Sequence, residues 1–338
     1  MKIILISTKA KNKKNNDNEN DILRSLYKSF TCKNIICCIY SIYFNSEIKF
    51  KGINFLYSIF NSVILGLMCK IKKIDLIIEF ELDNTINFKI IKYISKRTRL
   101  SMWCGVYENL LWSEIILKLN LCDYIWQPAI FNKKINSRLN NNILRYVGIA
   151  VDNEIYYYDY DEKYSYDIVF YGGISKGHTD RIETLEKIAL NFDSFVFFGY
   201  GIENLPQNSI LLNNFKGMAN QIELRKIISS SKIVINLTLD NYVENVSRGF
   251  NFRLLEIAAC KGAAQVIKYD EKIREFLNID NDLYTFTDTN DIVKNIKLCL
   301  SNEKLRAEKV DKAFISSLKS SYELMADRII YFYNESSI

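Results

Sequence analysis

Two arginines and a glutamate lie close together in residues 247–262: Arg248, Arg253 and Glu256. Guanidinium groups bind phosphate oxygens through two parallel hydrogen bonds, and a carboxylate accepts hydrogen bonds from ribose hydroxyls. The three side chains therefore suit an anionic sugar nucleotide. Taken alone, however, the stretch is better explained as a capped core helix with solvated charges, so the flanking sequence has to decide between the two.

The elements around this stretch favour a ligand site. Residues 232–237 are an apolar run typical of a buried strand, and residues 238–246 form a polar loop. Ser247 and Asn251 can each cap the helix that follows, and Gly262 ends its apolar pattern. The charged side chains would then lie at the carboxyl edge of a sheet, where open α/β folds bind their ligands.

A glycine pair gives a second candidate for phosphate binding. Residues 166–171 predict a strand, Gly172 and Gly173 follow it, and residues 180–190 predict a helix. Such a turn lets backbone N–H groups face a phosphate at a helix N-terminus. The basic side chains close enough to assist are Lys176, His178 and Arg181. Most Gly-Gly turns only reverse the chain, so this motif is weak by itself.

Strand and helix patterns alternate along the whole chain, which predicts an α/β fold with parallel, doubly wound sheets. In the first half, strands are expected at residues 2–7, 34–43, 75–81, 100–106, 124–127 and 144–149, and helices at 21–30, 53–69, 84–96 and 110–119. In the second half, further strands are expected at 194–198, 210–215, 264–269 and 283–286, and helices at 221–230, 271–277, 291–301 and, with a break, 304–333.

The alternation predicts two Rossmann-like domains. Residues 1–150 are expected to form the first domain and residues 151–320 the second. Residues 321–338 are expected to form a C-terminal helix that packs back on the first domain. The loop at residues 8–20 contains no glycine, which argues against a dinucleotide site on the first strand.

Composition narrows the function classes. The 338 residues are 49% hydrophobic and 25% charged, with a net charge of +6, and no basic-aromatic repeat indicates nucleic-acid binding. Eight cysteines without a C-x-x-C pair are typical of free thiols in a reducing compartment, and the single histidine excludes zinc sites built on several histidines. A signal peptide is not evident, so a cytoplasmic location is expected.

The most apolar helical segment, residues 53–69, falls short of the length that spans a bilayer. A buried helix is the favoured interpretation, and peripheral membrane contact stays open as an alternative.

Two further groups of residues are candidates for a site in the first domain. Aromatic rings that could stack on an acceptor are Trp103, Tyr107, Trp112 and Trp126, although each is more simply explained as core. Carboxylates that could act as a catalytic base are Glu79, Glu81 and Glu108.

The pair Asp159 and Asp161 forms a D-x-D pattern, which in one class of glycosyltransferases holds a divalent metal. Here its neighbours are tyrosines and charged residues, so we interpret it as solvated linker and expect no metal site.

The order of motifs in the second half resembles the C-terminal domain of GT-B-fold glycosyltransferases, and most closely the CgeB-like (spore maturation protein) group. The matching pieces are residues 166–173 with Arg181, residues 197–201, residues 232–237, and residues 253–256 with 259–263. Two departures are the inserted Lys261 and the absence of a carboxylate near Arg248 and Gly249, where wider retaining enzymes carry a glutamate.

The resemblance implies two domains that face a cleft, with the acceptor bound by residues 1–150 and the nucleotide sugar by residues 151–320. It also implies a hexosyltransferase-like enzyme that uses a nucleoside-diphosphate sugar, UDP- or GDP-linked, and no cofactor. No metal is expected, because the D-x-D pair is interpreted as linker. Glu256 would bind the ribose, and Arg253, Arg181 or Arg248 would face the diphosphate. The residues expected to line the donor site are Gly172, Gly173, Lys176, Arg181, Arg248, Asn251 and Glu256, and those expected to act in catalysis are Arg253 and Glu108.

The acceptor (a glycan, a protein or a lipid-linked molecule), the oligomeric state and the choice between retention and inversion stay open. Two alternatives also remain: a metal-dependent transferase using Asp159 and Asp161, and a non-catalytic protein that binds sugar nucleotides or glycans.

Overall fold

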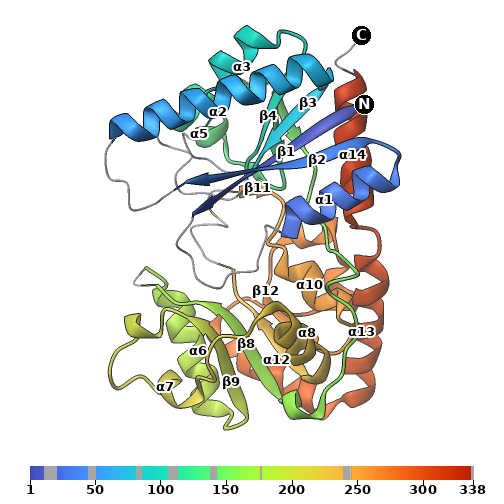
Figure 1. Ribbon diagram of the computed structural model, residues 1–338. Coiled ribbons are helices and arrows are strands. Elements are labelled where there is room, and N and C mark those ends of the chain that lie inside the picture. Colours follow the sequence, from blue (N-terminus) through green and yellow to red (C-terminus); the bar gives the residue numbers. More distant parts are fainter. Residues whose placement is uncertain are drawn as a thin grey trace. The chain divides into compact units, whose positions relative to one another are not determined.

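The computed structural model describes residues 1–10, 21–44, 51–80, 86–105, 113–137, 143–175, 177–238, 244 and 246–335. The chain divides into two compact units (Figure 1). Unit 1 comprises Met1–Gly148 and Tyr322–Ile338, and unit 2 comprises Ile149–Ser321. Among the described residues, no helix combines the length and the apolar character needed to cross a membrane.

Unit 1 is built on a six-stranded parallel sheet in the order β2-β1-β3-β4-β5-β7. Its strands are β1 (Lys2–Ala10), β2 (Ile36–Phe44), β3 (Leu76–Glu79), β4 (Arg99–Trp103), β5 (Tyr124–Gln127) and β7 (Leu144–Tyr146). The unit also contains β6 (Ile130–Phe131) and the helices α1 (Asp21–Cys32), α2 (Lys51–Lys72), α3 (Phe88–Ile94), α4 (Ser113–Leu119), α5 (Lys133–Asn136) and α14 (Tyr322–Glu335).

The centre of unit 1 follows from its apolar runs. Residues 3–6 in β1 are completely buried, as expected for a parallel strand covered on both faces. Helix α1 contacts the C-terminal helix α14. Arg328 of α14 donates a hydrogen bond of 2.7 Å to the carbonyl oxygen of Val147. The end of the chain is therefore part of unit 1, although the residues of unit 2 lie between it and the rest of unit 1 in the sequence.

Unit 2 contains a five-stranded sheet in the order β13-β12-β10-β8-β9, again with parallel pairs. Its strands are β8 (Ile168–Gly173), β9 (Phe195–Tyr200), β10 (Ile233–Asn236), β12 (Ala264–Lys268) and β13 (Tyr284–Phe286), with the separate β11 (Val246–Arg248). Its helices are α6 (Thr179–Asn191), α7 (Leu211–Asn214), α8 (Gln221–Ser230), α10 (Arg253–Ala259), α11 (Ile279–Asp282), α12 (Thr289–Ser301) and α13 (Glu303–Ser317), with the 3-10 turns η3 (Glu162–Tyr164), η4 (Ile202–Asn204) and η5 (Glu271–Glu275).

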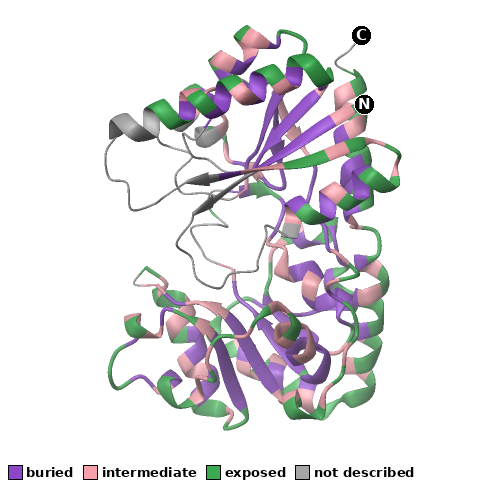
Figure 2. Ribbon diagram, viewed as in Figure 1, coloured by how far each residue is buried: buried purple, intermediate pink, exposed green. Residues whose placement is uncertain are grey.

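Side chains alternate between the two faces of this sheet. In β8, Val169 and Tyr171 join a core cluster with residues of α8 and α10, whereas Ile168 and Phe170 join a second cluster with residues of α6 and α12. Figure 2 shows the strands of the sheet buried between these helices. Because successive strand residues point to opposite faces, a continuous apolar run can fill two cores at once.

Strand order locates the place where a ligand is expected. The chain leaves β8 for β9 on one side and then returns to β10 on the other side of β8. The point between β8 and β10, where this direction reverses, is the topological switch point of the sheet. Open α/β sheets bind ligands outside the carboxyl ends of the strands at this point, because neighbouring loops there diverge to opposite faces.

Two predictions of secondary structure had different outcomes. Residues 210–215, expected as a strand, contain the short helix α7 (Leu211–Asn214) instead. The hydroxyl of Ser209 accepts a hydrogen bond from the Leu211 N–H at 3.4 Å and so favours a helical turn, and only Leu211 of the helix is buried. The break expected in the C-terminal helix is confirmed, because α13 ends at Ser317 and α14 begins at Tyr322.

Candidate functional site at the edge of the second sheet

Glycines leave the carboxyl ends of β8 and β9 without side chains. Gly172 of β8 pairs with Gly199 of β9. A Cβ atom on Gly199 would lie 1.9 Å from the carbonyl oxygen of Gly172, and one on Gly173 would lie 2.5 Å from the Tyr200 ring. The two strands therefore approach each other so closely that only glycine fits at Gly199. The result is an edge at which other groups can come close to the backbone.

Arg181 of α6 ties the two sides of the switch point together. Its Nη1 donates to the carbonyl oxygen of Gly173 at 2.7 Å, and its Nη2 donates to that of Leu237 at 2.9 Å. Burial, together with the nearby positive charge of Arg253, lowers the pKa of Arg181 to about 10. The side chain is therefore still protonated at neutral pH, and it supplies positive charge as well as the tie between β8 and β10.

Arg253 reaches the same strand end from the opposite face of the sheet. It is the first residue of α10, and its guanidinium carbon lies 4.7 Å from the centre of the Tyr171 ring and 5.8 Å from that of Phe170. A Cβ atom on Gly172 would lie 3.0 Å from Arg253 Nη2. The absence of a side chain at Gly172 therefore makes room for this guanidinium group.

Three buried polar atoms gather at this strand end. Nη1 of Arg253, Nε of Arg181 and the hydroxyl of Tyr171 have no hydrogen-bond partner within the described part of the chain. A buried donor without an acceptor costs about 1–3 kcal/mol, so folded proteins seldom keep several in one place without a reason. Oxygen acceptors of a ligand bound at this strand end are the kind of partner that such donors lack. Sequence reasoning missed Tyr171, which looked like an ordinary strand residue.

Glu256 lies three residues after Arg253 on α10, a spacing that places both side chains on one helix face. Burial, with the nearby Glu256 carboxylate, raises the pKa of Tyr171 well above its ordinary value. The pKa of the Cys260 thiol is also raised, first by burial and then by Glu256. The carboxylate of Glu256, which is only half-buried, therefore influences the same tyrosine that Arg253 covers.

Buried amides hold the start of α10 against the sheet. Asn251 accepts a hydrogen bond of 3.2 Å from the Leu254 N–H, which is the capping contact expected from the sequence. Asn236 of β10 donates to Gln265 of β12 at 3.3 Å, and Gln265 donates to the Leu254 carbonyl oxygen at 2.8 Å. Sequence reasoning missed both strand amides, for which the available signal was a polar residue within an apolar strand.

Ser247 and Arg248 lie outside helix α10, which carries Arg253 and Glu256. Both belong to the short strand β11, so Ser247 does not cap the helix as expected. Nε of Arg248 forms an ion pair with Glu275 at 2.9 Å, and the arginine side chain is 56% exposed. Arg248 therefore differs from Arg253, whose guanidinium group is held against two aromatic rings.

His178 serves the turn after β8. Its Nδ1 accepts a hydrogen bond of 3.1 Å from the Ser175 N–H just before α6 begins. This contact gives the histidine a structural role in the turn. Lys176, the other basic residue expected there, lies outside the described residues.

The candidates of the first domain have mixed outcomes. Glu108, Glu81, Tyr107 and Trp112 lie outside the described residues. Glu79 is completely buried and forms an ion pair of 2.7 Å with Lys118, so its carboxylate is poorly placed to accept a proton from a substrate. Trp103 and Trp126 are buried in the core of unit 1, where Trp103 stacks on Phe80, and the core interpretation of both is confirmed.

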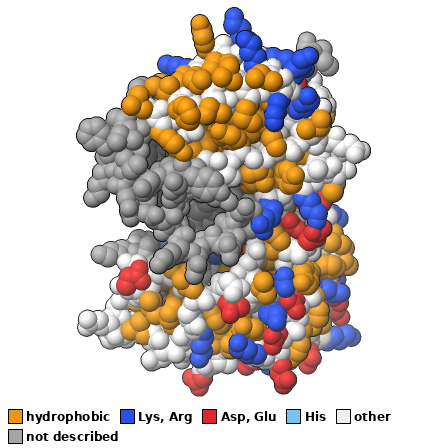
Figure 3. All heavy atoms as spheres, in the orientation of Figure 1, with side chains coloured by type: hydrophobic (Ala, Val, Ile, Leu, Met, Phe, Trp, Pro, Cys, Tyr) orange, Lys and Arg blue, Asp and Glu red, His pale blue; other side chains and the backbone are white. Residues whose placement is uncertain are grey.

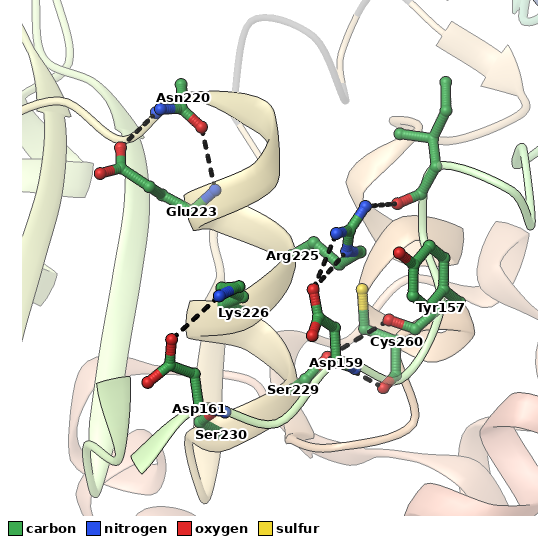
Figure 4. Close-up of polar contacts among 11 residues, drawn as sticks. Tyr157, Asp159, Asp161, Asn220, Glu223, Arg225, Lys226, Ser229, Ser230 and Cys260 are labelled. Atoms are coloured by element: carbon green, nitrogen blue, oxygen red, sulfur yellow. Dashed lines mark hydrogen bonds and ion pairs between the residues drawn. The ribbon is translucent and has the colours of Figure 1, made fainter. Parts of the chain in front are cut away.

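The D-x-D pair is bound to helix α8 (Figure 4). Arg225 donates to Asp159 Oδ2 from Nε at 3.0 Å and from Nη2 at 2.7 Å, and Lys226 donates to Asp161 at 3.0 Å. The next turn of the helix also holds the linker, because the hydroxyls of Ser229 and Ser230 accept the backbone N–H groups of Asp159 and Asp161. The pair therefore lies in a partly exposed linker, as interpreted from the sequence, but its carboxylates are held on α8 by ion pairs.

A metal ion needs several ligand side chains in one place. Within the described part of the chain, no three His, Cys, Asp or Glu side chains are grouped so that they could hold a metal ion. The charges that the structure does bring together, Arg181, Arg253 and Glu256, are those that suit phosphate and hydroxyl groups directly.

Comparisons with known proteins agree with a glycosyltransferase fold. Residues 181–327 match the family described as "Glycosyl transferase-like". A glycosyltransferase from Rickettsia africae ESF-5 is similar at a TM-score of 0.69 and 13% identity, covering 99% of this chain and 98% of that one. Alr3699/HepE from Anabaena, solved in complex with UDP and glucose, gives a TM-score of 0.69 at 11% identity over 100% of both chains.

The same fold also carries other chemistry. A putative UDP-N-acetylglucosamine 2-epimerase from Listeria monocytogenes is similar at a TM-score of 0.58 and 10% identity, covering 97% of this chain and 94% of that one. A comparison with curated protein sequences finds no match. The fold is therefore the GT-B type of α/β fold expected from the sequence. One fold hosts several activities, so the fold alone does not define the reaction.

Proposed function

We propose that this chain, whose residues 181–327 match a glycosyl transferase-like family, moves a sugar from a nucleoside-diphosphate donor to an acceptor. The single observation that carries the proposal is the group of buried polar atoms on Arg253, Arg181 and Tyr171 at the switch point. Phosphate oxygens are acceptors for such donors, and two guanidinium groups favour a ligand with negative charge. UDP or GDP would supply both.

The two arginines have different tasks in this proposal. Arg181 already uses both Nη atoms on backbone carbonyls, so it mainly contributes charge and holds the strand ends. Arg253 Nη1 has no acceptor among the described residues, so Arg253 is the better candidate for contact with the diphosphate. Breaking the bond to the sugar leaves about two negative charges on the nucleotide, and fixed donors stabilise such charge without reorganising.

Glu256 is proposed to accept hydrogen bonds from the ribose hydroxyls. Its place three residues after Arg253 puts both side chains on one face of α10, and its half-buried carboxylate influences the same Tyr171 that Arg253 covers. The catalytic base is not assigned, because Glu108 lies outside the described residues. Membership of the CgeB-like group remains part of the proposal and rests on the sequence motifs.

Metal independence is also proposed. Its support is that Asp159 and Asp161 are each ion-paired to α8, which leaves their oxygens poorly available to a cation. Transfer activity in EDTA tests this point. Full activity in EDTA agrees with the proposal. An activity that requires manganese and is lost in Asp159→Asn would instead assign the reaction to the metal-dependent alternative.

The donor site is tested with a panel of UDP- and GDP-sugars, scored first by thermal shift and then by transfer. Glu256→Ala is expected to abolish transfer and weaken nucleotide binding, with little loss of thermal stability because the side chain is only half-buried. Glu308→Ala, an exposed glutamate on α13, serves as the matched control. Unchanged turnover in the Glu256 variant would remove this residue from the site.

A second candidate is a protein that binds a sugar nucleotide without transferring the sugar. The observation in its favour is the absence of a carboxylate near Arg248 and Gly249, where wider retaining enzymes carry one. A donor-hydrolysis assay separates the two candidates. Nucleotide-sugar binding without any release of sugar, to water or to an acceptor, would support the binding protein.

A further inference from the structure

Helix α2 turns apolar side chains toward solvent. The residues that form its exposed row, here called the α2 outer stripe, are Leu56, Phe60, Val63, Leu67 and Ile71. Their spacing of three or four residues places them on one face of the 22-residue helix. Leu56, Phe60 and Ile71 are 65%, 61% and 78% exposed. A buried helix was the favoured interpretation of residues 53–69, with membrane contact left open, and the favoured interpretation was wrong for this face.

The inward face of the same helix carries polar side chains. Ser58, Asn61 and Ser62 are all buried. The Ser62 hydroxyl donates to the Ser58 carbonyl oxygen at 2.5 Å and accepts the Asn87 N–H at 2.7 Å. A surface helix normally buries its apolar face and exposes its polar one, so α2 has part of this pattern reversed.

Packing against α3 holds α2 in this orientation. A Cβ atom on Gly66 would lie 3.0 Å from the side chain of Ile94 in α3, so the two helices approach closely at this glycine. The hydrogen bond from Asn87, the residue that caps α3, fixes the same face of α2. Rotating α2 to bury its outer stripe would break both contacts, which means that the exposed apolar row is a stable feature of unit 1.

Positive charge borders the α2 outer stripe. Lys70, Lys72 and Lys73 are exposed at the end of the helix, and within the described residues none of them forms a salt bridge. Residues 51–74 contain no aspartate or glutamate. The next carboxylate, Asp75, is already paired with Arg97 at 3.2 Å. Figure 3 shows hydrophobic side chains gathered over unit 1, with Lys and Arg at the edge of this area.

We propose that the α2 outer stripe binds the surface of an anionic lipid bilayer. A helix lying in the interface inserts apolar side chains among the lipids while lysines contact the acidic headgroups. From Leu56 to Ile71 the stripe extends about 22 Å along the helix axis, long enough to lie flat along the surface. The proposal is independent of the donor chemistry above, because it concerns a different unit and needs no nucleotide.

Charge decides against the other occupants. In a symmetric dimer the same patch would face itself, so the lysines of two copies would be brought together. Nucleic acid would match the lysines but leaves the aliphatic and aromatic row without a suitable contact. An anionic bilayer is complementary to both parts of the surface.

The test is co-sedimentation of the full chain with vesicles of phosphatidylcholine alone and of phosphatidylcholine mixed with phosphatidylglycerol. We expect binding to the mixed vesicles only. The variant Phe60→Asn/Leu67→Asn is expected to bind more than about tenfold more weakly, because both side chains lose the gain from leaving water. Leu190→Asn/Ile222→Asn, which changes two exposed apolar residues of unit 2, is the matched control and should bind like the unaltered chain.

A second pair of variants tests the contribution of the lysines to vesicle binding. Lys70→Gln/Lys72→Gln/Lys73→Gln is expected to lose about a hundredfold in affinity for the mixed vesicles. The control Lys297→Gln/Lys304→Gln/Lys312→Gln makes the same change in net charge on exposed lysines of unit 2 and should lose much less.

Three results would overturn the proposal. The first is that the full chain binds neither kind of vesicle. The second is that the stripe variant and its control lose the same affinity for the mixed vesicles. The third is a stripe variant that binds vesicles normally but shifts the sedimentation coefficient of the protein, which would assign the surface to a second copy of the chain. Circular dichroism of each variant checks that the fold is retained.

Discussion

The guanidinium carbon of Arg253 lies 4.7 Å from the centre of the Tyr171 ring, and each of these residues has a buried polar atom without an acceptor or donor among the described residues. The ring and the cation attract each other, yet this contact provides no hydrogen-bond partner for Arg253 Nη1 or for the Tyr171 hydroxyl. A second cation, Arg181, is close enough for its pKa to be lowered by Arg253. The arrangement costs folding free energy, and an anionic ligand would recover that cost.

Removing Arg253 should therefore separate binding from stability. Arg253→Ala is expected to lower UDP-sugar binding or turnover by about a hundredfold or more, equivalent to roughly 3 kcal/mol. Its free energy of unfolding without ligand should change by less than about 1 kcal/mol, because the lost ring contact is offset by weaker repulsion of Arg181. Arg253→Lys should recover part of the binding, and Arg274→Ala, on the exposed turn η5, is the control. Calorimetric titration and urea unfolding give the two readouts.

Arg181 should behave in the opposite way. Arg181→Lys keeps the charge but cannot donate to Gly173 and Leu237 in the same planar geometry. We expect the free energy of unfolding to fall by about 1–3 kcal/mol, measured with urea. A variant as stable as the unaltered chain would show that the tie between β8 and β10 contributes nothing.

Gly199 is expected to be intolerant of any side chain. In Gly199→Ala the new Cβ would lie 1.9 Å from the Gly172 carbonyl oxygen, and the backbone φ is 154°. The strand ends would have to separate, so we expect a loss of several kcal/mol in thermal unfolding, or no folded protein. Gly177→Ala is the matched control, because a Cβ there meets no atom within 4 Å and should leave the melting temperature nearly unchanged.

Glu79 is predicted to stabilise the folded protein through its ion pair with Lys118. In Glu79→Gln the ammonium group of Lys118, which is 9% exposed, would lose its charged partner, and removing one member of a buried pair costs about 3–5 kcal/mol. The double variant Glu79→Gln/Lys118→Met should recover much of this loss. If Glu79→Gln instead kept full stability and abolished transfer, Glu79 would return as a candidate for the catalytic base.

Alkaline pH should destabilise the protein through its buried thiols. Burial raises the pKa of Cys104 from 9.0 to about 12. The unfolded chain then loses this proton above about pH 9 while the folded chain keeps it, so the stability is fully present below pH 9 and is lost as pH rises toward 12. The slope for one such thiol is at most about 1.4 kcal/mol per pH unit.

Urea unfolding in reductant at pH 8, 9 and 10 measures this decline. Burial also raises the pKa of Tyr171, which adds to the same trend. Cys104→Ala should show a shallower decline than the unaltered chain, even though its stability at pH 8 is lower. Identical slopes for the two proteins would contradict a buried, protonated thiol.

The sequence alone determined the local arrangements. Apolar runs such as residues 3–6, 168–171 and 233–235 predicted buried parallel strands, because a strand covered on both faces needs no polar side. The spacing of Arg253 and Glu256 placed both on one helix face, because three residues are close to one helical turn. Strand, glycine turn and helix in succession then predicted the edge of the second sheet at which the candidate site lies.

Only the tertiary structure decided the partners that come from distant elements. The second carbonyl bound by Arg181 belongs to Leu237, 56 residues away, and the carboxylate of Asp159 meets Arg225, 66 residues away. The outward face of α2 was equally undetermined, because apolar residues occur on both of its faces and the contact between Gly66 and α3 selects one. Spacing along a chain fixes neighbours within one element, whereas contacts between elements depend on how their surfaces pack, which no local pattern records.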